Sequence, residues 1–354
     1  MTSVLALTLL AATWTVDDDL AADFPSIAAA IQSPTVTDGD LLRVRDGSYG
    51  PFTLNKALTV IGPGPGGTAD VSGVSWIVAP GGASITRLAL SALRVSNVPG
   101  RVRVTECSIG LSPDPGSLVS FRVEGSAEVL VGATDVFGRP AASAAEQPLG
   151  MLVASSRVVL AGGRIEGGRG WNCWPSYCGG GDGGTALEVR SGADVLVAGT
   201  LSLHGGAAGH GNCGLAACLE DGRAGDGVRV QQSLLRLRAL QVGTGPYDPT
   251  YGGTPGHAMR ASQATVTSSG VTFAGAVDLS GSVHVTPPQV EPALLLNGAP
   301  IVGYVVSLVV ANAPPSSPVL VLASKRPAVV DVPGWEGPLW IDPAAPFAVV
   351  FSGT

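Results

Sequence analysis

A repeated pattern of short apolar runs constrains this chain more than any other feature. In each repeat a small residue precedes two apolar positions two residues apart, a bend follows, and a second apolar pair comes after it. The first apolar positions of four repeats are Val158, Val195, Leu235 and Ala264, so successive repeats lie 37, 40 and 29 residues apart. Alternation with a period of two predicts strands, and self-similarity at an irregular period is typical of solenoids whose loops vary in length. We therefore expect a stack of β coils.

The composition agrees with a structure that has a buried core and many turns. The 354 residues include 50 glycines and 27 prolines, but 45% are apolar and only 13% are charged, which is unlike a disordered chain. The net charge of −7 argues against a nucleic-acid or anionic-membrane partner. No segment offers the run of apolar residues that a membrane helix needs, so we expect no membrane span, and we expect a monomer.

Two signals stand near the amino terminus. Residues 1–13 form an apolar run that closes on small residues, as a secretory signal peptide does, although no Lys or Arg precedes it. The alternative is a first buried strand. The apolar residues of 20–32 fall at helical spacing, so we expect a short helix there, with the acidic residues 17–19 at its start and a strand from about 41 to 49 after it.

This amino-terminal arrangement carries a family resemblance. The segments 23–31 (DFPSIAAAI), 39–44 (GDLLRV) and 47–49 (GSY) resemble the cap and first coil of secreted, right-handed parallel β-helix proteins of the pectin-lyase-like superfamily. The resemblance implies an all-β fold over residues 14–285, with a capping helix at its open end. It implies little about activity, because this scaffold carries lyases, hydrolases, esterases and adhesins.

The composition changes from about Thr286, where prolines bracket short strand-like runs. We interpret residues 286–354 as a small antiparallel, sandwich-like β-domain. Trp335 and Trp340 lie in it, and we favour core positions for them over an exposed pair that stacks on sugars. Because the chain stops just after a strand-like run, we expect the natural protein to continue.

Glycines concentrate in one part of the chain. Residues 162–256 hold 25 of the 50, mainly in three insertions at about 167–184, 204–227 and 243–257. Each insertion separates one repeat from the next, so all three should leave the solenoid at the same corner and stack into one face. In solenoids such a face is often the binding face, and tolerated insertions without a role are the alternative.

Four of the five cysteines fall within these insertions, in the pairs Cys173/Cys178 and Cys213/Cys218. In an exported chain we expect disulfides within each pair, and cross-pairing between the loops is an open alternative. A zinc site helped by His204 or His210 is a further alternative, although exported proteins favour oxidation. Cys107, in a strand, should be a buried free thiol.

The sequence contains few of the catalytic motifs found in enzymes of the resembled superfamily. Gly209-His210-Gly211 matches one element of the polygalacturonase motifs, but the other elements are missing. A lyase would need acidic ligands for Ca²⁺ and a base, and the insertions offer five candidate acid–base residues: Asp182, Asp221, Asp226, Arg223 and His210. Aspartates in ordinary loop turns are the favoured interpretation, so we expect no resident cofactor.

The insertions also contain aromatic residues that could grip a sugar: Trp171, Trp174, Tyr177, Tyr247 and Tyr251. The sequence therefore favours an exported, non-catalytic β-helix module at the cell surface or outside the cell, binding glycans through residues 167–257. The alternative is a polysaccharide lyase or glycoside hydrolase acting on a uronate-containing polysaccharide.

Overall fold

The computed structural model describes residues 11–64, 66–110, 118–173, 179–211, 221–238, 240–280 and 284–286, together with six strands near the carboxyl terminus. The chain divides into two compact units, Met1–Pro287 and Pro288–Thr354. No helix among the described residues is long and apolar enough to cross a membrane.

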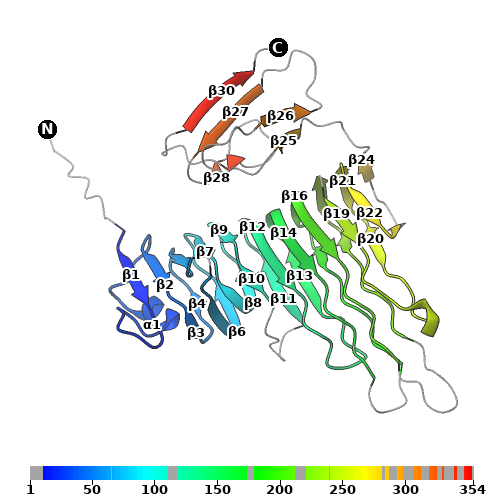
Figure 1. The fold of residues 1–354 in the computed structure, drawn as a ribbon, viewed down its shortest axis with the longest axis horizontal. Helices are drawn as coiled ribbons and strands as arrows, with labels where there is room; N and C mark the ends of the chain where they lie inside the picture. Colours follow the sequence, from blue (N-terminus) through cyan, green and yellow to red (C-terminus); the bar gives the residue numbers. More distant parts are fainter. Residues whose placement is uncertain are drawn as a thin grey trace. The chain divides into compact units, whose positions relative to one another are not determined.

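The first unit is a parallel β-helix built from one sheet of 24 strands (Figure 1). All pairings in this sheet are parallel, and apart from strands at the two ends of the solenoid each strand pairs with strands of the coils before and after it. The pairings fall into three columns. The first contains β4 (Thr53–Leu54), β6 (Ala69–Ile77), β8 (Ala89–Ser96), β11 (Val119–Glu124), β13 (Leu149–Ala154), β15 (Leu187–Arg190), β17 (Val228–Gln231), β20 (His257–Ser262) and β23 (Ala276–Ser280).

The second column runs alongside the first. It contains β1 (Thr13–Val16), β2 (Leu41–Val44), β5 (Thr59–Ile61), β7 (Ala83–Thr86), β9 (Arg101–Thr105), β12 (Glu128–Phe137), β14 (Arg157–Glu166), β16 (Asp194–His204), β18 (Leu234–Arg238), β21 (Thr265–Ser269) and β24 (His284–Thr286). The third contains β3 (Gly47–Tyr49), β10 (Ser108–Ile109), β19 (Gln241–Gly243) and β22 (Thr272–Ala274), with the first residues of β6 and β8 and the last residues of β12, β14 and β16.

The predicted repeats stack in register through the interior. Val158 pairs with Val195, and Val195 with Leu235, and all three side chains are almost completely buried. The fourth repeat was placed two residues too early, because Leu235 pairs with Val266 and not with Ala264. Each apolar side chain thus packs on the equivalent one of the next coil, and this stacking fills a continuous core.

The predicted helix is shorter than its apolar spacing suggests. Helix α1 spans only Ile27–Gln32 and begins at Ser26, whose Oγ accepts from the Ala29 amide at 3.1 Å. Leu20 is 65% exposed, and the acidic residues 17–19 do not cap the helix. Reciprocal backbone bonds of Phe24 with Thr15 and Asp17 hold residues 17–24 as a loop after β1, so only the second half of the predicted stripe becomes helical.

One corner of the solenoid uses left-handed backbone in six successive coils, a feature that the sequence did not reveal. The residues one position beyond β8, β11, β13, β15, β17 and β20 have φ between 48° and 60°: Asn97, Gly125, Ser155, Ser191, Gln232 and Gln263. The amides of most of them donate to carbonyls of the next coil. Only one of the six is glycine, so glycine content alone could not locate this corner.

The second unit contains three antiparallel strand pairs. These are β25 (Ala293–Asn297) with β26 (Ser307–Ala311), β27 (Val319–Ser324) with β30 (Phe347–Ser352), and β28 (Val329–Val330) with β29 (Leu339–Trp340). Trp335 lies outside the described residues, and only the backbone of Trp340 is described. Their predicted core positions stay predictions.

Candidate functional site

The three glycine-rich insertions leave the β-helix at one corner and lie side by side, as predicted (Figure 1). Each has an outgoing leg, which follows the third column, and a returning leg, which leads back to the first. The outgoing legs are residues 167–173, 205–211 and 244–248, and the returning legs are 179–186, 221–227 and 252–256. Apart from a 3₁₀ turn at Pro249–Tyr251 and an isolated bridge between Arg223 and Thr254, they contain neither helix nor strand.

Backbone hydrogen bonds connect outgoing and returning legs in alternation. The amide of Gly184 donates to Gly168, Gly206 to Gly184, and Gly225 to Gly206, each at 2.8 Å. Three residues further out the pattern recurs, with Gly181 donating to Trp171 and Gly209 to Gly181. A period of three residues without bonds inside a leg is the geometry of a polyproline II helix. The legs therefore form an ordered stack bonded through the backbone.

Close packing explains why these legs need glycine. A Cβ atom on Gly184 would lie 1.7 Å from the Pro148 carbonyl oxygen, and one on Gly206 would lie 1.9 Å from that of Gly168. Only glycine fits at such close approaches, because any other residue has a Cβ atom; the same restriction requires glycine at the axis of the collagen triple helix. The signal was present in the sequence as glycines three apart, such as Gly206 and Gly209, but we had interpreted the glycines as loop residues.

Two of the predicted acid–base residues meet at the outer part of the stack. His210 Nδ1 lies 3.1 Å from Asp221 Oδ2, and the Gly211 amide donates to Asp221 Oδ1 at 2.8 Å. The Asp221 side chain is only 2% exposed, whereas that of His210 is 53% exposed. Because a carboxylate accepts hydrogen bonds, Nδ1 is the donor in this contact, and Nε2 is left without a partner in the described part of the chain.

A larger cluster surrounds Asp226, where the second returning leg joins β17. Its carboxylate accepts from Arg223 Nη2 at 2.6 Å, Arg229 Nη2 at 3.0 Å and the His257 amide at 2.9 Å, and Arg260 Nε lies 3.6 Å away. Burial alone would raise the pKa of Asp226. The bonds from His257 and Arg229 and the charges of Arg223 and Arg260 outweigh burial and hold this pKa below its ordinary value.

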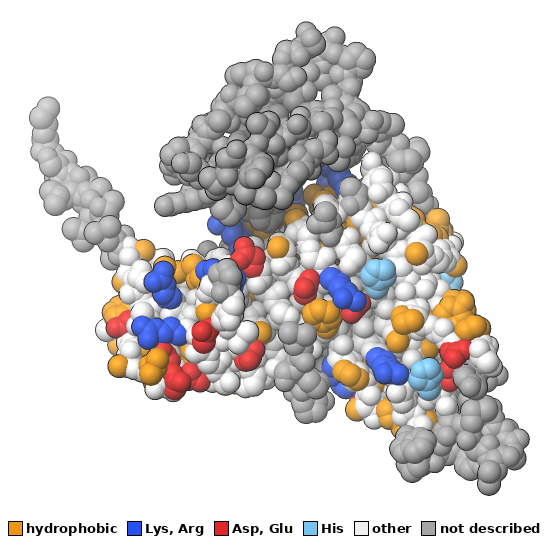
Figure 2. All heavy atoms as spheres, viewed as in Figure 1, with side chains coloured by type: hydrophobic (Ala, Val, Ile, Leu, Met, Phe, Trp, Pro, Cys, Tyr) orange, Lys and Arg blue, Asp and Glu red, His pale blue; other side chains and the backbone are white. Residues whose placement is uncertain are grey.

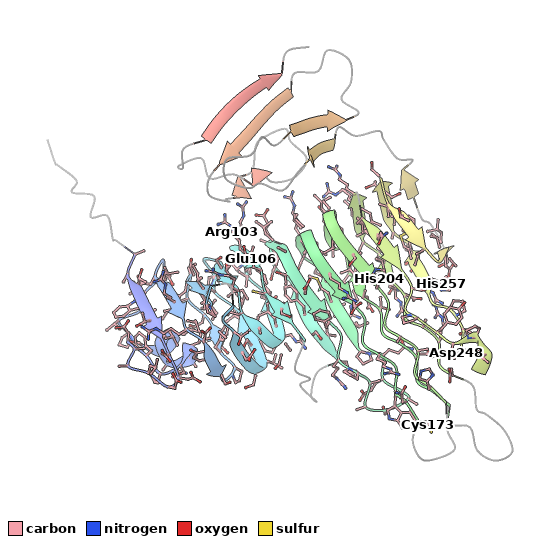
Figure 3. All side chains as sticks on the ribbon, viewed as in Figure 1. Arg103, Glu106, Cys173, His204, Asp248 and His257 are labelled. Atoms are coloured by element: carbon pink, nitrogen blue, oxygen red, sulfur yellow. The ribbon has the colours of Figure 1, made fainter. Side chains whose placement is uncertain are left out.

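His257 uses its Nδ1 as an acceptor, unlike His210. Its Nδ1 lies 2.7 Å from Arg223 Nη2 and 3.2 Å from Arg260 Nε. An arginine only donates, so Nδ1 accepts and the proton resides on Nε2. His204 and His257 lie near the strands, and Asp248 and Cys173 lie further out along the legs (Figure 3).

The predicted aspartates do not form a calcium site. Asp182 Oδ1 accepts from the Arg223 amide and Oδ2 from Gln147, so Asp182 fixes one leg to another. Within the described part of the chain, the only three acidic or metal-binding side chains that converge are Asp17, Asp18 and Asp19. Two of those three bind backbone amides or Arg45 and are explained by their loop.

Only part of the predicted aromatic set is described. Trp171 is half-buried on the first outgoing leg, and Tyr247 is 41% exposed on the third. Tyr251 ends the 3₁₀ turn, its side chain undescribed, and Trp174 and Tyr177 lie outside the described residues.

Two cysteines are described. Cys107 is a buried free thiol, as predicted, and burial raises its pKa to about 12. Cys173 is buried and disulfide-bonded, with its partner outside the described residues. Cys178, Cys213 and Cys218 also lie outside them, so the pairings stay predictions, whereas a zinc site that uses the Cys173 thiolate does not fit its disulfide bond.

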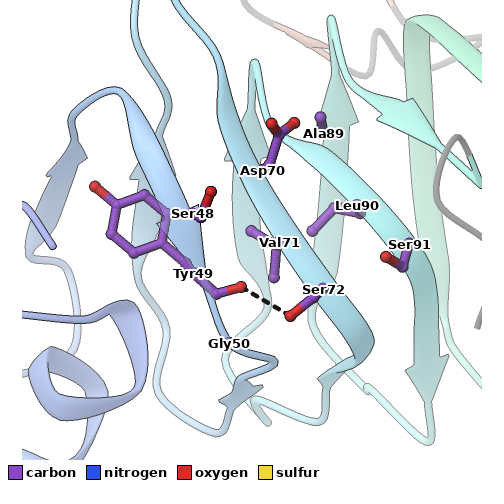
Figure 4. Close-up of a pocket in the computed structure, with 9 residues that line it drawn as sticks. All are labelled: Ser48, Tyr49, Gly50, Asp70, Val71, Ser72, Ala89, Leu90 and Ser91. Carbon is purple, nitrogen blue, oxygen red and sulfur yellow. Dashed lines mark hydrogen bonds between the residues drawn. The ribbon is translucent and has the colours of Figure 1, made fainter.

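A separate hollow of about 420 Å³ lies on β3, β6 and β8, far along the chain from the legs (Figure 4). Hydroxyl groups of Ser48, Ser72 and Ser91 line it, with one carboxylate, Asp70. The Tyr49 carbonyl accepts from Ser72 Oγ at 3.2 Å. Burial, followed by nearby aspartates, raises the pKa of Tyr49 to about 12, so this lining holds no evident acid–base pair.

Charge is mixed over the coils. On the face that Figure 2 shows, acidic and basic side chains are interspersed. No broad field of one sign is visible there.

Comparisons with known proteins show a likeness of fold. No protein-family model matches the chain, and no curated protein matches it. Among solved structures, the chain is similar to pectate lyase Pel9A, at 13% identity over 79% of this chain and 78% of that one, with a TM-score of 0.37. It is also similar to a pectin methylesterase in complex with a hexasaccharide, at 11% identity over 78% and 90%, with a TM-score of 0.30.

A third similar structure is pectin methylesterase PemA from Erwinia chrysanthemi, at 10% identity over 79% and 90% of the two chains, with a TM-score of 0.25. The parallel β-helix itself is defined by the strand pairings of the chain and not by these matches. At such identities the likeness concerns the fold alone.

Proposed function

We propose that this chain is an exported, non-catalytic parallel β-helix protein that acts at the cell surface or outside the cell as a glycan-binding module. One observation carries the proposal. The insertions form an ordered stack that holds polar and aromatic side chains in fixed positions, while their aspartates bind backbone amides and arginines. Loops held on a rigid scaffold are common binding surfaces.

The exposed side chains of the outgoing legs suit a sugar ligand. Tyr247 offers an apolar ring with a polar tip, and Asn172 and His210 are exposed on the neighbouring legs. The His210 amide donates to Asn172 Oδ1 at 2.9 Å, which fixes that side chain across two legs. Preorganised polar groups beside an aromatic ring bind with little loss of side-chain entropy.

A glycan array tests this proposal. The wild-type protein should bind at least one glycan class, and Tyr247→Ala should weaken that binding about tenfold, equivalent to roughly 1.4 kcal/mol. Trp76 is the matched control, because it is an equally exposed aromatic residue on an early coil, at 42% against 41%. Trp76→Ala should leave binding unchanged. Absence of any glycan signal, or equal loss in both variants, would count against the proposal.

An enzyme remains the second candidate, as a polysaccharide lyase or glycoside hydrolase on a uronate-containing polysaccharide. The half-exposed imidazole of His210, oriented by the buried Asp221, is the observation that favours it, since this is how a general base is held. Unsaturated or reducing sugars released from a polyuronate by wild-type protein but not by His210→Ala would establish this candidate and overturn the first.

We also propose finer features of the architecture. The right-handed solenoid is covered at its first coil by α1, which buries Ile27, Ala30 and Ile31 against the core. Residues 286–354 form a sandwich-like domain, and residues 1–13 are removed on export. Sequencing the amino terminus of secreted protein tests the last point, because an intact Met1 would contradict it.

A further inference from the structure

The cluster around Asp226 holds more positive charge than its own carboxylates neutralise. Arg223, Arg229 and Arg260 all lie within 3.6 Å of the Asp226 carboxylate, which is 1% exposed. Among the described residues, the other carboxylate paired with these guanidinium groups is that of Asp278, half exposed and 3.9 Å from Arg260 Nε, whereas Asp182 binds the backbone amide of Arg223. Three guanidinium groups therefore share one close acidic partner and one distant one, in a chain whose net charge is −7.

The neighbouring strands do not supply the missing negative charge. Arg229 on β17 pairs in register with Glu188 on β15 and with Arg260 on β20. Glu188 is already bound to Arg190 at 3.2 Å. His257 accepts from two arginines and carries no proton on Nδ1, so it adds no charge while these bonds persist.

The three arginines retain unused donors that reach solvent. Within the described residues, no hydrogen bond involves the Nη1 group of Arg223, Arg229 or Arg260, and their side chains are 28%, 36% and 34% exposed. Asp226 and His257 hold the inner edges of these side chains in place. Fixed, partly desolvated guanidinium groups with free N–H bonds are the usual receptor for an oxyanion.

We propose that Arg223, Arg229 and Arg260 form a binding site for one oxyanion group, the sulfate or carboxylate of an anionic glycan. This inference rests on the proposed glycan-binding function and adds the chemical class of the ligand. The site lies where the returning legs join the first-column strands. A glycan bound along the legs would place its acidic group at this junction.

Direct anion binding is the first test. Equilibrium dialysis with ³⁵S-labelled inorganic sulfate at constant ionic strength should show saturable binding to the full chain. Arg229→Gln and Arg260→Gln should each weaken it about tenfold. Arg45→Gln removes the same charge from an arginine paired with Asp17 near the amino terminus, and should leave sulfate binding unchanged. Absence of sulfate binding, or an equal effect of Arg45→Gln, would overturn the site.

Oligosaccharides then identify the source of the oxyanion. Binding of a sulfated heparin tetrasaccharide, a tetragalacturonate and neutral maltotetraose is measured for wild-type protein and Arg229→Gln, with thermal melting as a check of folding. Preference for one anionic oligosaccharide, lost in Arg229→Gln, supports the site and names its group. If neutral and anionic glycans bind equally and Arg229→Gln changes neither, this inference is wrong while the proposed function stands. If sulfate binds but no array glycan does, the proposed function fails while the anion site stands.

Discussion

The β coils and the glycine legs are built from one continuous chain and pack by opposite means. In the coils, apolar side chains such as Phe121, Leu42 and Ile85 are completely buried and stack on their equivalents in the next coil. In the legs, backbone approaches backbone so closely that most glycines could not carry a Cβ. The coils therefore gain stability from buried apolar area, and the legs from hydrogen bonds that the absence of side chains permits.

Because the coils and the legs pack differently, opposite kinds of substitution should destabilise them. A coil loses stability when a large side chain is removed, because a cavity remains. A leg loses stability when a small side chain is added, because nothing can move aside. Since each coil or leg contacts mainly its neighbours, damage to one region should remain local.

The largest effect is expected in the coils. Phe121→Ala removes a fully buried ring from β11 and should cost about 3–5 kcal/mol in free energy of unfolding. Urea denaturation gives the cost, and hydrogen exchange locates it in β8, β11 and β13. Phe121→Leu is the control and should cost less, because it leaves a smaller cavity. Equal loss of amide protection in the legs would refute the separation of the two regions.

The reciprocal experiment adds one methyl group to a leg. Gly206→Ala places a Cβ against the backbone of Gly167 and Gly168 and should cost about 2–3 kcal/mol. Gly50→Ala is the matched control, since a Cβ there meets nothing within 4 Å, and it should change stability by less than about 0.5 kcal/mol. Hydrogen exchange should quicken at Gly184 and Gly225, and unchanged exchange would show that the legs are ordinary loops.

The sequence predicted the coils better than the legs for a physical reason. Burial of one strand face requires apolar residues at every second position, and this alternation was enough to place Val158, Val195 and Leu235 in register from the sequence. The legs have no alternating apolar pattern, and their glycines, three apart as at Gly206 and Gly209, are easily taken for ordinary loop residues. One partner of Asp226 was hidden too: Arg223 and Arg229 lie three residues from it in the sequence, but Arg260 reaches it only because the next coil stacks on β17.

Lowering the pH should reduce the stability of the junction between legs and coils, because this junction depends on the charge of Asp226. The pKa of Asp226 is lowered in the folded protein, so its contribution is complete above the ordinary value of 3.8 and is lost as pH falls through the lowered pKa. Asp226→Asn should cost about 1–2 kcal/mol at pH 6, and the cost should shrink below pH 3.8. Urea denaturation from pH 6 to pH 3 measures it. A cost that stays constant across this range would mean that the charge contributes nothing.

The smallest expected effect is a gain in stability where a coil lacks the glycine that later coils have. Ala133 in β12 has φ +46°, and by register it lies opposite Gly162 of β14, which has φ +75°. Left-handed backbone strains alanine but not glycine, so Ala133→Gly should stabilise the protein by about 0.5 kcal/mol after the entropy cost of glycine is subtracted. Ala161→Gly, one position before Gly162 in an extended strand, is the control and should destabilise by about 0.5–1 kcal/mol. Urea midpoints that shift in the same direction for both variants would show that backbone strain does not govern this corner. Opposite shifts would show that glycine acts here through backbone conformation, whereas in the legs it acts through the space that it leaves.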